Sequence, residues 1–169
     1  MNEKILVLGG RNSGKSLHAE MLTWKLCKRP VYIATSKIID KETKLKVDKH
    51  KLRRKDKWQE YDAYLDLIDV INRTDILGAR LVDCITWWLN NLVYEKVDWE
   101  KELEKLIECI KKQENHLIFV SNEIGLGIIP DNKISREFSQ IAAEANKKIA
   151  SAVNRVDFIV SGIPIKLKG

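Results

Sequence analysis

The stretch from Gly9 to Ser16 has the residue types and spacing of a phosphate-binding loop. It reads Gly9, Gly10, Arg11, Asn12, Ser13, Gly14, Lys15 and Ser16, which fits the pattern G-x-x-x-x-G-K-[ST]. Glycines in such a loop let backbone N–H groups converge on phosphate oxygens. We expect Lys15 to reach the β- and γ-phosphates and the Ser16 hydroxyl to bind Mg²⁺. The loop therefore predicts binding of the triphosphate of ATP or GTP.

Two acidic residues are candidates for the group that holds the water shell of the metal. Asp83 closes the short apolar run Arg80-Leu81-Val82 and is the better candidate. Glu123 follows another apolar run and precedes a glycine-bearing loop. Its carboxylate would orient magnesium or a substrate hydroxyl, or it would stabilise the loop or cap a helix, and the sequence leaves these alternatives open.

The segment from Lys41 to Lys57 holds the whole excess of positive charge. It contains nine basic residues and three acidic ones, and the formal net charge of the chain is +6. A focused positive field attracts a polyanion such as a nucleotide, a nucleic acid or an anionic membrane. The alternative interpretation is a solvated helix face.

His50 lies inside this basic segment. On a helix, Lys46, Arg53 and Arg54 would share its face and would favour the neutral imidazole. A neutral imidazole is what a nucleophile attacking phosphorus requires, and guanidinium groups beside it would hold the phosphates. A lone histidine in a charged helix is more often a surface residue, so spacing alone leaves both hypotheses open.

Apolar runs separated by helical patterns indicate the elements that position these residues. Strands are predicted over 4–8, 30–34, 81–83, 116–121 and 156–160. Helices are predicted over 15–28, through Tyr61, Leu65, Ile68 and Ile71, and over 87–93, 98–112 and 133–154, with Asp98 as an N-cap. The phosphate loop thus has its expected strand before it and helix after it. The alternation predicts an α/β fold with a mostly parallel sheet covered by helices.

Length and composition predict one domain over residues 1–169, with a basic helical excursion at about 37–61. No apolar run approaches the roughly 20 residues of a membrane helix, so we expect no membrane span. Cys27, Cys84 and Cys109 are odd in number and form no Cys-x-x-Cys pair, which is typical of reduced thiols in the cytoplasm. The histidines show no metal-ligand spacing, so magnesium is the only metal expected.

Several motifs outside the loop strengthen the functional hypothesis. They are Tyr32-Ile33-Ala34-Thr35; Asp40 and Glu42; His50, Arg54 and Trp58; Asp83-Cys84-Ile85-Thr86; Val120 to Pro130; and Ser161-Gly162-Ile163-Pro164 with Lys166. Together with the phosphate loop they resemble the bifunctional adenosylcobinamide kinase and adenosylcobinamide-phosphate guanylyltransferase family of cobalamin assembly. The resemblance covers nearly the whole chain, and the Asn-Glu-x-Gly-x-Gly-x-x-Pro stretch is its most specific part.

The resemblance implies a RecA-like P-loop sheet, usually in a homotrimer, with two reactions on one chain. ATP or GTP first phosphorylates the corrinoid adenosylcobinamide, and GMP from GTP is then transferred to the new phosphate through a guanylylated histidine that matches His50. The chain departs from the family pattern at Arg11-Asn12, at Lys55, and at Glu60 and Asp62. None of these departures removes a group that the chemistry requires.

Two other functions fit parts of the sequence. One is a P-loop kinase of another small hydroxyl substrate, in which His50 would be dispensable. The other is a nucleotide-gated nucleic-acid-binding protein that uses the basic segment, with affinity that falls steeply with salt. No RNA- or DNA-binding motif accompanies the charge, so we expect no nucleic-acid partner.

Overall fold

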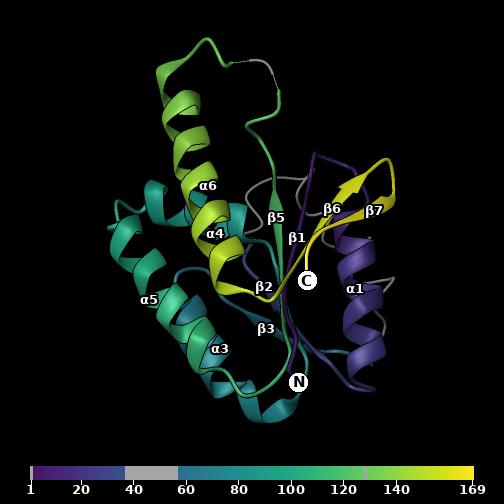
Figure 1. Cartoon of the computed structure of the whole chain (residues 1–169). Helices are drawn as coiled ribbons and strands as arrows, with labels where there is room; N and C mark the ends of the chain where they lie inside the picture. The colour runs from purple at the N-terminus through teal and green to yellow at the C-terminus, as the bar shows by residue number, and fades with distance from the viewer. Residues whose placement is uncertain (1, 37–56, 128) are drawn as a thin grey trace.

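The computed structural model describes residues 2–36, 57–127 and 129–169 of the chain. Within them a seven-stranded sheet has the order β3-β2-β4-β5-β1-β6-β7. All neighbouring pairs are parallel except β6 and β7. Helix α1 covers one face of the sheet, and α3, α4, α5 and α6 cover the other (Figure 1). The predicted α/β fold is confirmed.

The elements follow one another in an order of strands and crossover helices. The strands are β1 (Lys4–Gly9), β2 (Val31–Ala34), β3 (Gln59–Asp62), β4 (Arg80–Asp83), β5 (Leu117–Asn122), β6 (Arg155–Val160) and β7 (Ile163–Lys168). The helices are α1 (Lys15–Leu26), α3 (Leu67–Arg73), α4 (Ile85–Tyr94), α5 (Trp99–Lys112) and α6 (Lys133–Ala152), with a short 3₁₀ helix η2 (Asp75–Leu77).

The sheet is buried on both faces because its central strands carry apolar side chains in both directions. On β1, Leu6 and Leu8 pack into the core beneath α3 to α6, while Ile5 and Val7 pack into the core beneath α1. Parallel strands need crossover helices, and those helices cover both faces. A continuous apolar run is therefore the sequence pattern of such a strand.

Two parts of the sequence prediction are wrong. The helical pattern through Tyr61 starts too early, because Gln59–Asp62 form strand β3 and the helix begins at Leu67. The other residues of the predicted basic excursion, 37–56, lie outside the described residues. Strand β7 was not predicted. Both strands lie at the edges of the sheet, where a strand is half exposed and needs no apolar run. The predicted N-cap is confirmed, since the Asp98 side chain accepts a hydrogen bond from the Lys101 amide.

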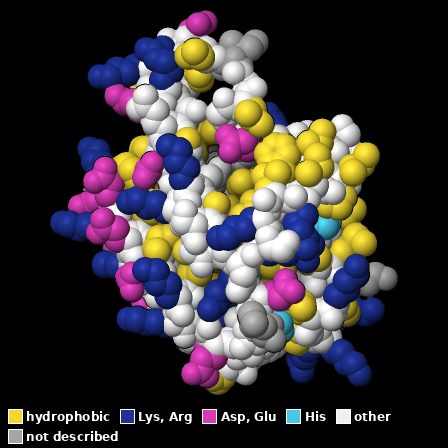
Figure 2. All heavy atoms as spheres, in the orientation of Figure 1, with side chains coloured by type: hydrophobic (Ala, Val, Ile, Leu, Met, Phe, Trp, Pro, Cys, Tyr) yellow, Lys and Arg dark blue, Asp and Glu magenta, His cyan; other side chains and the backbone are white. Residues whose placement is uncertain are grey.

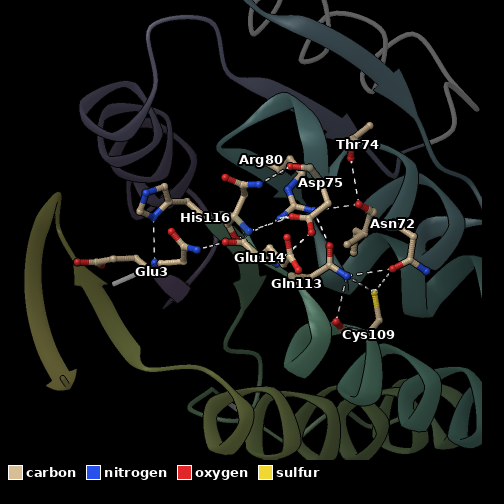
Figure 3. A network of polar contacts seen from close by, with 12 residues as sticks. Glu3, Asn72, Thr74, Asp75, Arg80, Cys109, Gln113, Glu114 and His116 are labelled. Carbon is tan, nitrogen blue, oxygen red and sulfur yellow. Dashed lines mark hydrogen bonds and ion pairs between the residues drawn. The ribbon is translucent and has the colours of Figure 1, made fainter.

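A buried polar network (Figure 3) lies at the amino-terminal ends of the parallel strands, whereas the phosphate loop follows the carboxyl end of β1. The Arg80 side chain is fully buried and donates to the Ile71 carbonyl, to Oε1 of Gln113 at 2.6 Å and to the Asn115 carbonyl. Its Nη2 atom also pairs with Oδ1 of Asp75 at 2.5 Å. Burial lowers the pKa of Arg80, and the Asp75 carboxylate opposes that shift. The network connects β4 to α3, η2 and the end of α5.

The surface divides into charged and apolar regions. Lys, Arg, Asp and Glu side chains gather over α5, whereas hydrophobic side chains gather over the β6–β7 hairpin (Figure 2). The latter include Ile163, Ile165 and Leu167, which are 66%, 48% and 62% exposed. Among the described residues, no helix is both long and apolar enough to span a membrane.

Candidate active site

The strand order brings the candidate residues to one edge of the sheet. Strand β5 lies between β1 and β4, with Gly9 opposite Asn122 and Asp83 opposite Val120. All three strands are parallel, so their carboxyl ends meet at this edge, where α/β proteins bind ligands. The phosphate loop after β1, Glu123 after β5 and Asp83 at the end of β4 therefore lie on neighbouring strands.

A close contact explains one glycine of the phosphate loop, and a left-handed backbone explains another. A Cβ atom on Gly9 would lie 2.6 Å from the carbonyl oxygen of Ile159 and 2.6 Å from Oγ of Ser13. Gly14 has a φ of 100°, which is left-handed, and it forms the N-cap of α1. The helix begins directly after it, so its first N–H groups and its positive dipole end point toward the loop. This arrangement suits an anion such as a phosphate.

Backbone hydrogen bonds hold the loop to two other segments. The amide of Glu123 donates to the Gly9 carbonyl at 3.0 Å, and the amide of Gly162 donates to the Ser13 carbonyl at 2.9 Å. Gly162 belongs to the β6–β7 turn, where Ser161 also has a positive φ. The Oγ atom of Ser13 is buried and has no hydrogen-bond partner among the described residues. A hydroxyl in this position can donate to a phosphate oxygen.

Lys15 is buried at the first position of α1, with 6% of its surface exposed. Its ammonium group donates to the Gly10 carbonyl at 2.7 Å, so the side chain folds back along the loop. Burial lowers the pKa of Lys15, and the nearby Asp83 carboxylate opposes that shift. A partly desolvated cation held in this way interacts more strongly with a phosphate than it would in water.

Asp83 is half-buried and accepts a hydrogen bond from the Tyr32 hydroxyl at 3.0 Å. Cys84 follows it, and burial raises the pKa of the Cys84 thiol to about 12. This thiol is therefore neutral at physiological pH and is not a nucleophile. The Tyr32–Asp83 hydrogen bond joins two strands of the described sheet, and no local sequence pattern predicts it.

Glu123 makes contacts that fit the loop-stabilising alternative left open by the sequence. Its Oε1 atom accepts from the Gly125 amide at 2.9 Å, which stabilises the glycine-bearing loop. Asn146 of α6 donates to the Asn122 carbonyl at 3.1 Å and lies 3.5 Å from Oε2 of Glu123. Glu123 remains half-buried at the edge where the phosphate loop lies. It stays a candidate for orienting the metal or a hydroxyl.

The residues at this edge fit magnesium bound together with a nucleotide. Ser16 is half-buried in the first turn of α1, which follows β1 in the chain. Asp83 ends β4, which is separated from β1 by β5. The described residues contain no group of three or more His, Cys, Asp or Glu side chains that would form a protein cage for a metal. Magnesium is commonly held by substrate phosphates, waters and one or two protein oxygens, which is the donor set available here.

The predicted residues His50, Arg53 and Arg54 lie outside the described residues. The described chain resumes at Lys57, next to Trp58, which is buried. The ring of Trp58 packs edge-on against Tyr32 and against Trp24 of α1, with centroid distances of 5.8 and 5.9 Å. The chain that follows the basic segment is therefore packed against the helix that begins at the phosphate loop.

The fold and the loop place the protein in the class of P-loop NTPases. The most informative structural similarities are to an ATPase of a type III secretion system of pathogenic bacteria (TM-score 0.57, 10% identity, 97% of this chain and 56% of that one) and to the flagellar accessory protein FlaH of Methanocaldococcus jannaschii (TM-score 0.52, 12% identity, 98% and 78%). At such low identity these similarities support the fold alone.

Within that class, the chain belongs to the cobinamide kinase / cobinamide phosphate guanyltransferase family, which matches residues 5–167. It is 37% identical to the bifunctional adenosylcobalamin biosynthesis protein CobP of Pseudomonas aeruginosa, over 97% of this chain and 96% of that protein. It is 33% identical to the bifunctional adenosylcobalamin biosynthesis protein CobU of Escherichia coli K12, over 97% and 99%. The family resemblance expected from the sequence is confirmed.

Proposed function

We propose that this protein phosphorylates adenosylcobinamide with ATP or GTP and then transfers GMP from GTP to adenosylcobinamide phosphate, giving adenosylcobinamide-GDP. The observation that carries the proposal is the family match over residues 5–167, which includes both the phosphate loop and the basic segment. A cytoplasmic location and a homotrimeric assembly are parts of the same proposal. The described structure supports the proposal because the phosphate loop, Asp83 and Glu123 lie at the carboxyl ends of neighbouring strands.

In the phosphoryl-transfer step, the loop amides and Lys15 would hold the β- and γ-phosphates in line with the attacking hydroxyl. The buried ammonium of Lys15 would stabilise the negative charge that develops on the oxygen bridging the β- and γ-phosphates. Ser16 and Asp83 would hold magnesium, which supplies charge neutralisation on the phosphate oxygens when bound. Glu123 would orient the hydroxyl or a magnesium-bound water.

In the guanylyl-transfer step, an imidazole nitrogen of His50 would attack the α-phosphorus of GTP. A P–N bond forms, the bond between the α-phosphorus and the bridging oxygen breaks, and pyrophosphate leaves. A phosphate oxygen of adenosylcobinamide phosphate then attacks the same phosphorus, the P–N bond breaks, and the histidine is regenerated. Two displacements of this kind avoid one difficult reaction between two anions. Arg53 and Arg54 would neutralise the phosphates around His50.

The first experiment is to incubate the protein with magnesium and GTP labelled at the α-phosphate, and then to denature it. We expect label that stays on the protein, is lost in acid and is stable in alkali, as a phosphoramidate is. His50→Ala should abolish this label and spare some kinase activity. Lys15→Ala should reduce labelling by weakening the hold on the triphosphate.

His116→Gln is the matched control for the loss of a histidine. His116 accepts a hydrogen bond from the Glu3 amide at the amino-terminal ends of β1 and β5, away from the phosphate loop. This variant should therefore be labelled like the unmodified protein. Label retained in His50→Ala would overturn the covalent role of His50. If GTP binds and no label forms on any variant, a kinase of another hydroxyl substrate becomes the better hypothesis.

A further inference from the structure

The Tyr32 side chain connects the aromatic cluster beneath α1 to the acid at the end of β4. Tyr32 is 4% exposed, and its hydroxyl donates to Oδ2 of Asp83 at 3.0 Å. The two residues belong to paired parallel strands, on which Tyr32 lies opposite Leu81 and Asp83 lies opposite Ala34. Tyr32 therefore lies two residues before the position opposite Asp83, and the two side chains meet diagonally across the strands.

The position of the Tyr32 ring is fixed by other aromatic residues. Trp58 packs edge-on against it with an interplanar angle of 89°, and Trp24 packs edge-on against Trp58 at 81°. Trp58 is 7% exposed, so the contact lies inside the core beneath α1. Lys57 also places its ammonium group 5.3 Å from the centroid of the Trp24 ring. A ring enclosed in this way has little freedom to move its hydroxyl.

We propose that Tyr32 is a positioning residue for Asp83, and that it sets the orientation of this carboxylate for the water shell of nucleotide-bound magnesium. The inference rests on the proposed function, in which Asp83 is the metal-linked acid. A phenol hydroxyl that donates to Oδ2 fixes the rotation of the carboxylate and leaves Oδ1 to accept from a metal-bound water. Residues that orient a metal-linked carboxylate commonly change metal affinity by about tenfold or more when they are mutated.

The same contacts connect Trp58 to the proposed magnesium-linked carboxylate. Trp58 directly follows the basic segment in the chain and contacts the Tyr32 ring, whose hydroxyl contacts Asp83. A displacement of Trp58 would therefore move the Tyr32 ring and, with it, the hydroxyl that donates to the Asp83 carboxylate.

The test is Tyr32→Phe, which removes one oxygen atom and keeps the aromatic ring. Affinity would be measured by calorimetry for a GTP analogue with a methylene bridge between the α- and β-phosphates, so that no guanylylation occurs, without corrinoid and over a series of Mg²⁺ concentrations. We expect the Mg²⁺ concentration for half-maximal affinity to rise about tenfold. Affinity in the presence of excess EDTA should stay unchanged, because the loop contacts to the phosphates remain.

Two further variants distinguish a wrong assignment of Tyr32 from a wrong assignment of Asp83. Tyr61→Phe removes a hydroxyl from neighbouring strand β3, where the Tyr61 ring contacts Arg73, and it should leave the Mg²⁺ dependence unchanged. Asp83→Asn should raise the Mg²⁺ requirement, and Tyr32→Phe added to it should have no further effect, because contacting residues are not additive.

The outcomes distinguish this inference from the proposed function. If Asp83→Asn changes the Mg²⁺ dependence and Tyr32→Phe does not, the positioning role of Tyr32 is wrong and the role of Asp83 stands. If Asp83→Asn has no effect, the metal assignment in the proposed function is wrong as well. Equal loss of affinity with and without Mg²⁺ in Tyr32→Phe would indicate a merely structural role and would overturn the inference.

Discussion

Gly9 shows how tightly the phosphate loop is packed at the level of single residues. A side chain at this position would meet a backbone carbonyl of β6, which cannot move without disturbing the pairing of β1 and β6. At Gly10, by contrast, a Cβ atom would have no neighbour within 4 Å. Of these two adjacent glycines, only Gly9 is required by packing.

We expect Gly9→Ala to lower the free energy of unfolding by about 1–3 kcal/mol, the usual cost of overpacking. Gly10→Ala is the matched control, and it should change the free energy of unfolding little. Urea denaturation of the two variants and the unmodified protein measures the difference. Equal stabilities of the two alanine variants would contradict the close contact with Ile159.

The residues of the candidate site differ in how far the sequence predicts them. The phosphate loop is contiguous in the chain, so Gly9 to Ser16 are recognisable from spacing alone. Asp83 was identified because it ends an apolar run. The contacts of Tyr32, Asn146 and Gly162 join strands, helices and turns that are distant in the chain, and no local pattern encodes such pairs.

At the scale of elements, central strands were predicted and edge strands were not. Strand β3 has the sequence Gln-Glu-Tyr-Asp, and β7 alternates apolar residues with proline and lysine. Neither has the continuous apolar run of a strand buried on both faces. Pro164 is tolerated because β7 is an edge strand, and the Ser161-Gly162 turn with two positive φ angles suits a two-residue hairpin.

The Arg80 network gives a prediction at this scale, because it joins β4 to the helices around it. Asp75→Asn removes the carboxylate that pairs with the buried guanidinium. Breaking a buried pair from one side costs about 3 kcal/mol or more in unfolding free energy. The network (Figure 3) lies where β4 begins, whereas the phosphate loop follows the carboxyl end of β1, so nucleotide affinity should be unchanged.

Asp98→Asn provides the matched control for this prediction. It makes the same chemical change at the exposed N-cap of α5, where asparagine caps a helix as well as aspartate does. We expect its denaturation curve to coincide with that of the unmodified protein. A similarly small effect of Asp75→Asn would show that Gln113 and the carbonyl acceptors suffice to hold Arg80.

At the scale of the whole molecule, the exposed apolar side chains of β7 bear on assembly. An exposed, apolar edge strand is a surface that proteins usually cover. We expect the protein to form a homotrimer, as the family resemblance implies. Light scattering during size-exclusion chromatography should give a mass about three times the 19.5 kDa of the chain. A mass of one chain at every concentration tested would show that the prediction is wrong.

The hydrogen bond from Gly162 to Ser13 has a consequence for synthesis on the ribosome. The phosphate loop is translated early, but in the described sheet β1 pairs with β5 and β6, and its loop is held by the turn after β6. A nascent chain therefore carries the complete phosphate-loop sequence long before it has the segments that shape it. Nucleotide capture should begin only when the β6–β7 turn has emerged from the exit tunnel, so occupancy by GTP would report that translation of this fold is nearly finished.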